Sequence, residues 1–347
     1  MENVLVISSY PRQGTLHGNR FSAVAGYCKN TLDAMDAAGR EETEYVVLAD
    51  VLDAPRSYRE GNREVIRCWR RNDWLVYPRL LRHALRHPDC RKGLLQFEFG
   101  MFGNRKALVG LLPLFILCLR LLGRGVHLVS HGVITSAAEV SGQLGLQKRS
   151  LRVRAYDSLL RNIYRLLVLC SSGTIVFEEH LRRKLLRVVN LPKKVAVIPH
   201  GVERRAEVSR EHARDRLGLG PDDLVVLNFG FLIWYKGSDW LAESFLAHLR
   251  ERPGTKCRLV FAGGPSGVHR SDPVYARYVE DLEKTAARHE RITITGYLRE
   301  EEIDLYFAAC DLVVLPYRVL ISASGPFSFT IAHGKPFMLS ASLRGYL

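Results

Sequence analysis

Short apolar runs alternate with longer segments of helical periodicity along the whole chain. In the first half, the runs that predict buried strands are Asn3–Ser8, Tyr45–Ala49, Gly93–Phe99, Gly125–Gly132, Gly173–Phe177 and Lys194–Ile198. Continuous apolar runs of this kind are typical of strands that are covered on both faces. Because helical segments such as Phe21–Met35 lie between them, the pattern predicts a parallel α/β sheet.

The second half of the chain repeats this alternation. Its predicted elements are strands at Val225–Leu227, Arg258–Ala262, Ile292–Ile294 and Leu312–Leu315, and helices from Ser238 or Asp239, over Val274–His289 and over Glu300–Ala309. Pro199 and Gly201 break the pattern, and the segment Glu203–Arg216 that follows is highly charged. We therefore expect two doubly wound, Rossmann-like domains, residues 1–200 and 201–347, that face a cleft lined by strand carboxyl ends.

The stretch Val225–Trp240 carries the clearest candidate chemistry. A strand runs through a glycine turn into a helix that begins near Ser238, and both Ser238 and Asp239 are good N-cap residues. Backbone N–H groups at such a helix start bind anions, so Gly230 would allow a close approach and Lys236 would meet a phosphate. An ordinary strand–turn–helix with a surface lysine remains the alternative, and the P-loop pattern is absent.

The net charge and the cysteine content indicate which binding partners and which cellular compartment suit the chain. The 347 residues carry a net charge of +14, which suits nucleic acid, an anionic membrane surface or small polyanions. The seven cysteines are scattered, odd in number and without C-x-x-C spacing, so a disulfide framework or a metal site is disfavoured. A reducing, cytoplasmic location fits better, and no secretory signal precedes the first strand.

Three basic or apolar segments of the first half each allow two interpretations. Arg59–Lys92 interleaves arginines with aromatic residues, which suits single-stranded nucleic acid, but leucines at helical spacing favour amphipathic helices with a solvated basic face. Ala107–Leu119 is too short to span a bilayer and predicts either a buried helix or one that touches a membrane surface. Lys148–Leu169 predicts a basic amphipathic helix, suited to an anionic leaflet or to solvent.

Two positions at strand ends of the first half are further candidates. His131 follows the strand at Gly125–Gly132, at the sheet edge where ligands bind in such folds. The loop Ser9–Asn19 follows the first strand at the same edge and lacks G-x-G-x-x-G, so a dinucleotide cofactor is disfavoured.

Several segments together resemble the retaining GT-B glycosyltransferases of family 4. These are Phe229–Gly237 (FGFLIWYKG), Val197–Val202 (VIPHGV), Phe261–Pro265 (FAGGP), His131–Gly132, and Asp311–Pro336 with DLVVLPYR and SASGPFSFTIAHGKP. Each motif is moderately specific, and their order and spacing carry the resemblance. It covers most of the chain and is strongest from Val197 onward.

The resemblance implies a nucleotide-sugar donor, UDP- or GDP-linked, and neither metal nor cofactor. It implies that Lys236 neutralises the leaving diphosphate and that His131 touches the donor sugar, as the two catalytic residues. The donor-binding residues that it implies are Gly230, Phe231, Gly263, Gly296, Tyr297, Arg318, Ser324, Gly325 and Pro326, with Pro326 at the first position of a helix. Gly14, Thr15 and His17 would form a loop on the acceptor side.

The chain departs from the family pattern at three places. The paired glutamates of many members would align with Ile321 and Phe329, and Phe231 stands where many have an arginine. The chain also ends at Leu347, soon after Gly334-Lys335-Pro336, so we expect either a fragment or a trimmed second domain. The missing carboxylates leave the donor and the activity open, because such groups normally hydrogen-bond sugar and ribose hydroxyls.

The leading hypothesis is a cytoplasmic hexosyltransferase that acts with retention on a glycan, lipid-linked or small-molecule acceptor. Peripheral attachment to the inner face of the membrane is part of this hypothesis. A glycoside phosphorylase on the same fold and a non-catalytic nucleotide-sugar-binding protein are the alternatives. A nucleic-acid-binding function is disfavoured, because no recognised nucleic-acid module is present.

Overall fold

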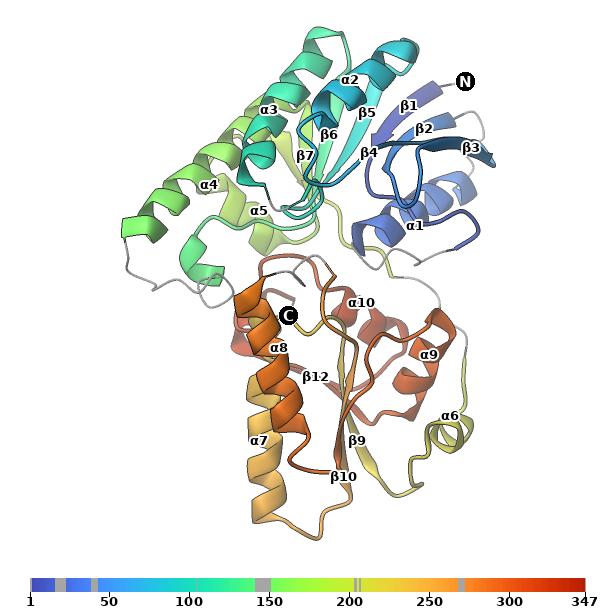
Figure 1. Ribbon diagram of the computed structural model, residues 1–347, viewed down its shortest axis with the longest axis vertical. Helices are drawn as coiled ribbons and strands as arrows, with labels where there is room; N and C mark the ends of the chain where they lie inside the picture. The colour runs from blue at the N-terminus through green and yellow to red at the C-terminus, as the bar shows by residue number, and fades with distance from the viewer. Residues whose placement is uncertain are drawn as a thin grey trace. The chain divides into compact units, whose positions relative to one another are not determined.

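The computed structural model describes residues 2–15, 23–38, 43–103, 105–140, 151–202, 205, 207–267 and 272–346. The chain forms two compact units (Figure 1). The first contains Met1–Ala137 and Leu151–Pro199, and the second contains His200–Leu347 together with a short segment that begins at Ala138. His17 and residues 148–150, which carry part of the expectations above, lie outside the described residues.

An eight-stranded sheet organises the described part of the first unit, in the order β3-β4-β2-β1-β5-β6-β7-β8. The strands are β1 (Glu2–Ile7), β2 (Thr43–Asp50), β3 (Arg56–Glu60), β4 (Arg63–Trp69), β5 (Lys92–Phe97), β6 (Gly125–Ser130), β7 (Gly173–Val176) and β8 (Val195–Val197). All neighbours pair in parallel except β3 and β4, which form an antiparallel hairpin at one edge. The predicted parallel sheet is therefore present, with an added hairpin.

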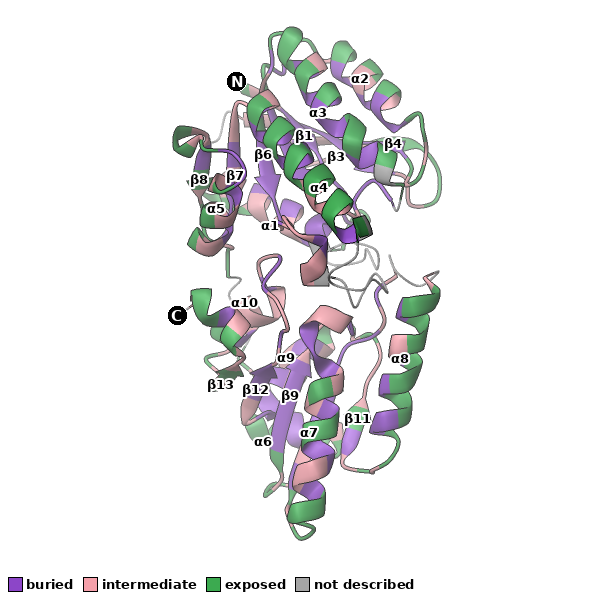
Figure 2. Cartoon of the chain, turned by 90° about the vertical axis from the view of Figure 1, so that its left-hand side faces the viewer, coloured by how far each residue is buried: buried purple, intermediate pink, exposed green. Residues whose placement is uncertain are grey.

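The helices of this unit cover both faces of the sheet. They are α1 (Ala23–Ala37), α2 (Val76–Arg86), α3 (Lys106–Leu121), α4 (Leu151–Cys170) and α5 (Glu179–Leu186). Cys28 and Leu32 of α1 pack on one face, while α2, α3 and α4 pack side by side on the other (Figures 1 and 2). Among the described helices, none combines the length and the apolar character that a membrane crossing needs.

The arginine-rich segment differs from the expected amphipathic helices. Its first part, Arg63–Trp69, is the strand β4, and only Val76–Arg86 is helical. Arg67 is buried and donates to the carbonyl oxygens of Tyr10 and Asp50, and Arg63 pairs with Asp33 and Asp36. Arg63 and Arg67 form their hydrogen bonds and ion pairs inside the unit, so they do not form an exposed nucleic-acid surface.

A five-stranded parallel sheet, in the order β11-β10-β9-β12-β13, organises the described part of the second unit. The elements are β9 (Leu224–Phe229), β10 (Cys257–Ala262), β11 (Ile292–Ile294), β12 (Leu312–Leu315), β13 (Phe337–Leu339), α6 (Arg210–Leu217), α7 (Ser238–Glu251), α8 (Pro273–Ala286), α9 (Glu300–Ala309) and α10 (Gly325–Ala332). Helices α7 and α8 cover one face, while α9 and α10 cover the other.

This strand order reverses direction between β9 and β12. The chain moves outward from β9 through β10 to β11, and then returns to the other side of β9 at β12 and β13. In an open parallel sheet, the loops at such a reversal diverge to opposite faces and leave a crevice at the carboxyl ends of the strands. The topology alone therefore places a ligand site of this unit after Phe229 and Leu315.

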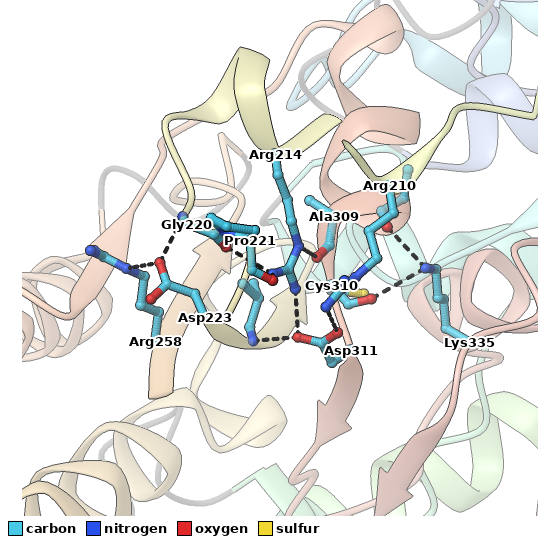
Figure 3. A network of polar contacts seen from close by, with 12 residues as sticks. Arg210, Arg214, Gly220, Pro221, Asp223, Arg258, Ala309, Cys310, Asp311 and Lys335 are labelled. Atoms are coloured by element: carbon cyan, nitrogen blue, oxygen red, sulfur yellow. Dashed lines mark hydrogen bonds and ion pairs between the residues drawn. The ribbon is translucent and has the colours of Figure 1, made fainter. Parts of the chain in front are cut away.

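Basic side chains fix the ends of several helices. Arg214 of α6 donates to the carbonyl oxygen of Ala309 and to the Asp311 carboxylate at 2.7 Å, which ties α6 to the end of α9 and the start of β12 (Figure 3). Other cations that donate to carbonyls at helix ends include Arg124 after α2, Arg120 and Lys194 at the end of α4, and Lys335 after α9. Last-turn carbonyls have no partner within the helix, so a cation there both bonds them and matches the helix dipole.

Candidate functional site

The carboxyl ends of β9 and β10 meet through two glycines. Gly230 has φ +112° and Gly263 has φ +156°, and a Cβ at Gly263 would collide with the Gly230 carbonyl oxygen. A Cβ at Gly230 would lie 2.9 Å from Lys236 Nζ and 2.9 Å from Pro326 Cγ. Gly230 therefore lies where the lysine, the neighbouring strand and the start of α10 converge, and a close approach of a ligand at this glycine stays a prediction.

Lys236 carries a buried cation at this point. It ends a short 3-10 turn, Trp234–Lys236, and is only 8% exposed. Within the described part of the chain, no carboxylate lies at ion-pair distance from Nζ, which instead lies 5.8 Å from the centre of the Tyr317 ring. Burial lowers the pKa of Lys236 from 10.5 to about 8. A buried ammonium group without an acidic partner is a candidate site for an anionic ligand.

The N-terminus of α10 adds a second anion-binding feature. Ser324 caps the helix, since its Oγ accepts the backbone N–H of Phe327 at 3.2 Å and lies 2.9 Å from the Tyr317 hydroxyl. Gly325 is the first helical residue and Pro326 the second, so the expectation that Pro326 opens the helix is wrong by one position. The dipole of this helix start favours negative charge beside Lys236. Pro326 has no N–H and the N–H of Phe327 is bonded to Ser324, so the dipole contributes more than free backbone donors do.

The start of α7 differs from the expected capping. Gly237, with φ +73°, precedes the helix in the left-handed conformation, and neither Ser238 nor Asp239 is the N-cap. Ser238 instead donates from its hydroxyl to Asn228 Oδ1 at 3.1 Å, and Asn228 donates to the Val314 carbonyl oxygen at 2.8 Å. Tertiary bonds to β9 and β12 thus replace the local cap.

The side-chain contacts of Arg318 are with Asp239, Trp234 and Trp240. Its guanidinium donates to both carboxylate oxygens of Asp239, at 2.8 and 2.6 Å, and to the carbonyl oxygen of Trp234. It also lies 4.8 Å from the centre of the Trp234 ring and 4.0 Å from that of Trp240. These contacts fix the loop after β12 against α7, and a donor-binding role of Arg318 stays a prediction.

Two aromatic residues border the same edge of the sheet. Phe231 follows Gly230, and its ring meets the ring of Tyr297 edge-on with centroids 6.2 Å apart. Tyr297 is 43% exposed and follows Gly296, which has φ +73° after β11. The structure therefore brings Phe231 and Tyr297 together beside the glycine turn, with Gly296 preceding Tyr297.

Apolar packing occupies the positions that align with the family's paired glutamates. Ile321 is buried, and Phe329 packs against Phe229 with ring centroids 5.2 Å apart and against Phe307 at 6.0 Å. The Arg205 guanidinium lies 4.5 Å from the centre of the Phe329 ring. At these positions the chain offers packing surface where carboxylates would offer hydrogen-bond acceptors.

In the first unit, His131 follows β6 and is nearly buried. Its Nε2 lies 2.7 Å from Gln96 Oε1 on β5, and its ring packs edge-on against Tyr27 and Phe177, with centroids 4.9 and 5.1 Å away. A hydrogen bond to the amide oxygen requires a proton on Nε2, and it fixes the ring orientation. The bond and the two rings hold His131 at the carboxyl edge of the sheet.

The loop after β1 is only partly described. Gly14 has φ +76° with open space around its Cα, and the exposed Thr15 donates from its hydroxyl to the Arg12 carbonyl oxygen at 2.8 Å. His17 lies outside the described residues. The acceptor-side assignment of this loop therefore stays a prediction.

Two residues of these sites had no role assigned to them from the sequence. Tyr317 is buried between Lys236 and Ser324, and Gln96 is the hydrogen-bond partner of His131. Gln96 could have been found as a polar residue in an otherwise apolar strand, GLLQFEF. Tyr317 belongs to the segment Pro316-Tyr317-Arg318, which is part of the family resemblance, but its contacts with Lys236 and Ser324 are formed only by the fold.

Comparison with known proteins agrees with this geometry. Residues 223–341 match the family Glycosyl transferases group 1. A segment of 133 residues is 34% identical to the D-inositol 3-phosphate glycosyltransferase of Streptomyces scabiei, and it covers 36% of this chain and 28% of that protein. The chain spans about a quarter of the length of the first curated relatives that it matches, 21–28%.

Two solved structures resemble the whole chain. Sucrose-phosphate synthase from Thermosynechococcus elongatus has a TM-score of 0.71 at 18% identity, and the match covers 98% of this chain and 82% of that one. Anabaena Alr3699/HepE in complex with UDP-glucose has a TM-score of 0.64 at 14% identity, covering 100% and 83%.

The fold is that of the GT-B glycosyltransferases, with two parallel α/β sheets, as the sequence predicted. The glycine turn, the buried lysine and the start of α10 all lie within the residues that match the family Glycosyl transferases group 1. The resemblance noted from the motifs is thus confirmed over residues 223–341.

Proposed function

We propose that the protein transfers a hexosyl unit from a nucleotide-diphosphate sugar to an acceptor with retention of configuration. The observation that carries this proposal is Lys236, a buried cation beside Gly230 and the start of α10 that has no acidic partner among the residues that the structure describes. A diphosphate supplies the missing negative charge, and the positive helix end adds to the attraction.

The proposed chemistry places the leaving diphosphate at this point. As the glycosidic bond breaks, negative charge develops on the phosphate oxygen, and the Lys236 ammonium and the helix start stabilise it. The acceptor attacks from the same face, and the departing phosphate takes the acceptor's proton. In this scheme His131, oriented by Gln96, contacts hydroxyls of the donor sugar.

The proposal assigns a different substrate to each half of the chain. Residues 201–347 bind the nucleotide sugar, and residues 1–200 serve the acceptor, which is a glycan, a lipid-linked sugar or a small molecule. HepE was solved with UDP-glucose and the Streptomyces relative is named for D-inositol 3-phosphate, so UDP-sugars and polar acceptors are the first to test. We place the reaction in the cytoplasm, at the inner face of a membrane.

A ligand screen with the whole chain tests the site. Thermal unfolding is followed with UDP, GDP and inorganic phosphate, and with the variant Lys236→Met as control. A nucleotide at 100 times its dissociation constant should stabilise the protein by about 2.7 kcal/mol, and the variant should lose this shift. Stabilisation by phosphate but by neither nucleotide would instead favour a glycoside phosphorylase.

A non-catalytic nucleotide-sugar-binding protein is the second candidate. Its support is the apolar packing of Ile321 and Phe329, which offers no carboxylate to the sugar or ribose hydroxyls. A donor-hydrolysis assay across common UDP- and GDP-sugars separates the two functions. Turnover that Lys236→Met abolishes supports the transferase, whereas nucleotide binding without turnover of any donor or acceptor supports the second candidate.

A further inference from the structure

The charge of Arg318 is already neutralised within the second unit. Its guanidinium pairs with both carboxylate oxygens of Asp239, with Nη–Oδ distances of 2.8 and 2.6 Å, and its side chain is only 10% exposed. The centres of the Trp234 and Trp240 rings lie 4.8 and 4.0 Å from the guanidinium carbon. A guanidinium that is paired and covered in this way attracts a nearby anion only weakly. Its effect on a ligand must therefore be exerted through the residues that it holds.

The residues that Arg318 holds lie on both sides of Lys236. The backbone N–H of Arg318 donates to the Tyr235 carbonyl oxygen at 2.7 Å, and its guanidinium donates to the Trp234 carbonyl oxygen. Both carbonyl groups belong to the short 3-10 turn that Lys236 ends. Asp239 lies in the first turn of α7, directly after this turn. Arg318 thus bonds the chain before the lysine and the chain after it.

The whole segment Pro316–Arg318 packs against this turn. A Cβ at Gly237 would lie 2.1 Å from the Pro316 carbonyl oxygen, so the chain that leaves the turn passes directly against Pro316. The hydroxyl of Tyr317 lies 2.9 Å from Ser324 Oγ, at the start of α10. One segment of three residues therefore connects the turn that carries the lysine with the helix start beside it.

We propose that Arg318 is a positioning residue that holds the ammonium group of Lys236 in its buried place beside Gly230. The planar guanidinium bonds Trp234 and Asp239 at once, which fixes the backbone of the turn between them. In its effect on ligand binding, the inference rests on the proposed nucleotide site. The placement of the lysine itself can be measured without nucleotide. Direct contact of Arg318 with the donor is the alternative that the experiments must exclude.

The buried ammonium group needs such a restraint, because its burial is unfavourable. Burial lowers the pKa of Lys236 to about 8, since water solvates the charged form better than the interior does. The lysine side chain is a flexible stem and would turn toward water if the backbone of its turn could move. The bonds from Arg318 to the turn and to α7 oppose this movement.

The stability of the whole chain as a function of pH tests the placement without a ligand. Between about pH 8 and pH 10.5 this lysine should add stability as pH rises, because the unfolded chain binds more protons there. If Arg318→Gln releases Lys236 into water, its folded-state pKa moves toward 10.5 and most of this rise is lost. Combined with Lys236→Met, Arg318→Gln should leave the pH dependence unchanged. A rise in Arg318→Gln as steep as in the parent protein would overturn the proposal.

Variants of the ion pair distinguish positioning from direct attraction in UDP binding. Asp239→Asn removes a negative charge near the site, so an effect of charge alone would strengthen the binding of UDP. We expect it instead to weaken binding at least about tenfold, as Arg318→Gln should, because either change breaks the bonds that hold the turn. Arg318→Lys keeps the charge but not the planar fork, and it should weaken binding nearly as much. Titration calorimetry near neutral pH measures these affinities.

The matched control is Arg258→Gln. Arg258 pairs with Asp223 at 2.6 Å near the amino end of β10, at the opposite end of the strand from the site, so its loss should change neither the pH dependence nor the UDP affinity. Melting curves establish that each variant is folded, and Asp239→Asn replaces Arg318→Gln in both tests if the latter is not.

The outcomes separate this inference from the proposed function. If Arg318→Lys binds UDP as the parent protein does and Asp239→Asn binds it more tightly, Arg318 acts on the anion directly and the positioning role is refuted. If UDP does not bind the parent protein, the proposed nucleotide site fails, and the pH dependence of stability still decides whether Arg318 places Lys236.

Discussion

The Nζ of Lys236 lies 5.8 Å from the centre of the Tyr317 ring. An aromatic face attracts a cation through its quadrupole, and this attraction is larger when both groups are desolvated. The ring thus helps to keep an ammonium group in a buried place without neutralising it. The charge remains available for an anionic ligand, which a carboxylate at the same position would prevent.

Replacing Lys236 with methionine should raise the stability of the protein and abolish its binding of UDP. The pKa of about 8, against 10.5 for a free lysine, means that burial of the ammonium costs up to roughly 3 kcal/mol at neutral pH. We expect Lys236→Met to melt at a higher temperature than the parent protein while UDP no longer shifts its melting temperature. Calorimetry with and without UDP measures both effects, and a lower melting temperature would contradict the assigned cost.

The same lysine should make nucleotide binding depend on pH. The ammonium form binds the diphosphate, so affinity should fall as pH rises above about 8. The charge of the UDP diphosphate changes little there, because the last phosphate ionisation has a pKa near 6. Titration calorimetry from about pH 7 to about pH 8.8, below the ionisation of the uracil ring, tests this, and an affinity that stays constant over that range would show that Lys236 is not the anion's partner.

Stability should show the opposite trend. Because the folded-state pKa lies below the unfolded one, the unfolded chain binds more protons between about pH 8 and pH 10.5. This lysine's contribution to stability therefore rises with pH across that window. Lys236→Met should lack the rise, which makes it the matched control for both titrations.

A methyl group at Gly230 should disturb the anion site directly. The added Cβ would lie 2.9 Å from both Lys236 Nζ and Pro326 Cγ, and the backbone has φ +112°, which alanine adopts at a cost of about 1–3 kcal/mol. We expect Gly230→Ala to lower stability by this amount and UDP affinity at least about tenfold. Gly254→Ala is the control, since its Cβ meets nothing within 4 Å. Equal effects of the two variants would count against the site.

Tyr317 should contribute through its hydroxyl and its ring separately. Tyr317→Phe removes the 2.9 Å hydrogen bond to Ser324 and should cost about 1 kcal/mol of stability with less than tenfold loss of UDP affinity. Tyr317→Leu also removes the ring beside Lys236 and should bind UDP more weakly than Tyr317→Phe. Identical affinities of the two variants would show that the ring does not support the cation.

The elements of the second half follow closely from local sequence. Glu300–Ala309 and Leu312–Leu315 match the structure at both ends, because each has a clear apolar pattern and a distinct boundary.

The segment Arg63–Trp69 was predicted wrongly, because it forms a strand and not a helix. Its arginines suggested a solvated helix face, yet Arg67 is held by carbonyl groups of Tyr10 and Asp50, which are distant in sequence.

In the candidate site, too, contacts between residues that are distant in sequence could not be predicted. Local sequence placed Gly230, Lys236 and Ser324 correctly at strand and helix ends, because such ends follow from apolar patterns and turn residues. It could not find the pairing of Arg318 with Asp239, 79 residues away, or the bond from Ser238 to Asn228 that replaces the expected cap. These partners are chosen by the packing of α7 against β9 and β12.

Some arginines of the chain are buried, and this affects its behaviour on a charged column. Arg124 and Arg214 are bonded to carbonyl groups at helix ends, so they contribute less to the charge exposed on the surface than the net value of +14 suggests. Salt screens buried interactions far less than exposed ones. A concentrated salt wash should therefore strip bound polyanions from the surface during purification while these helix ends stay intact.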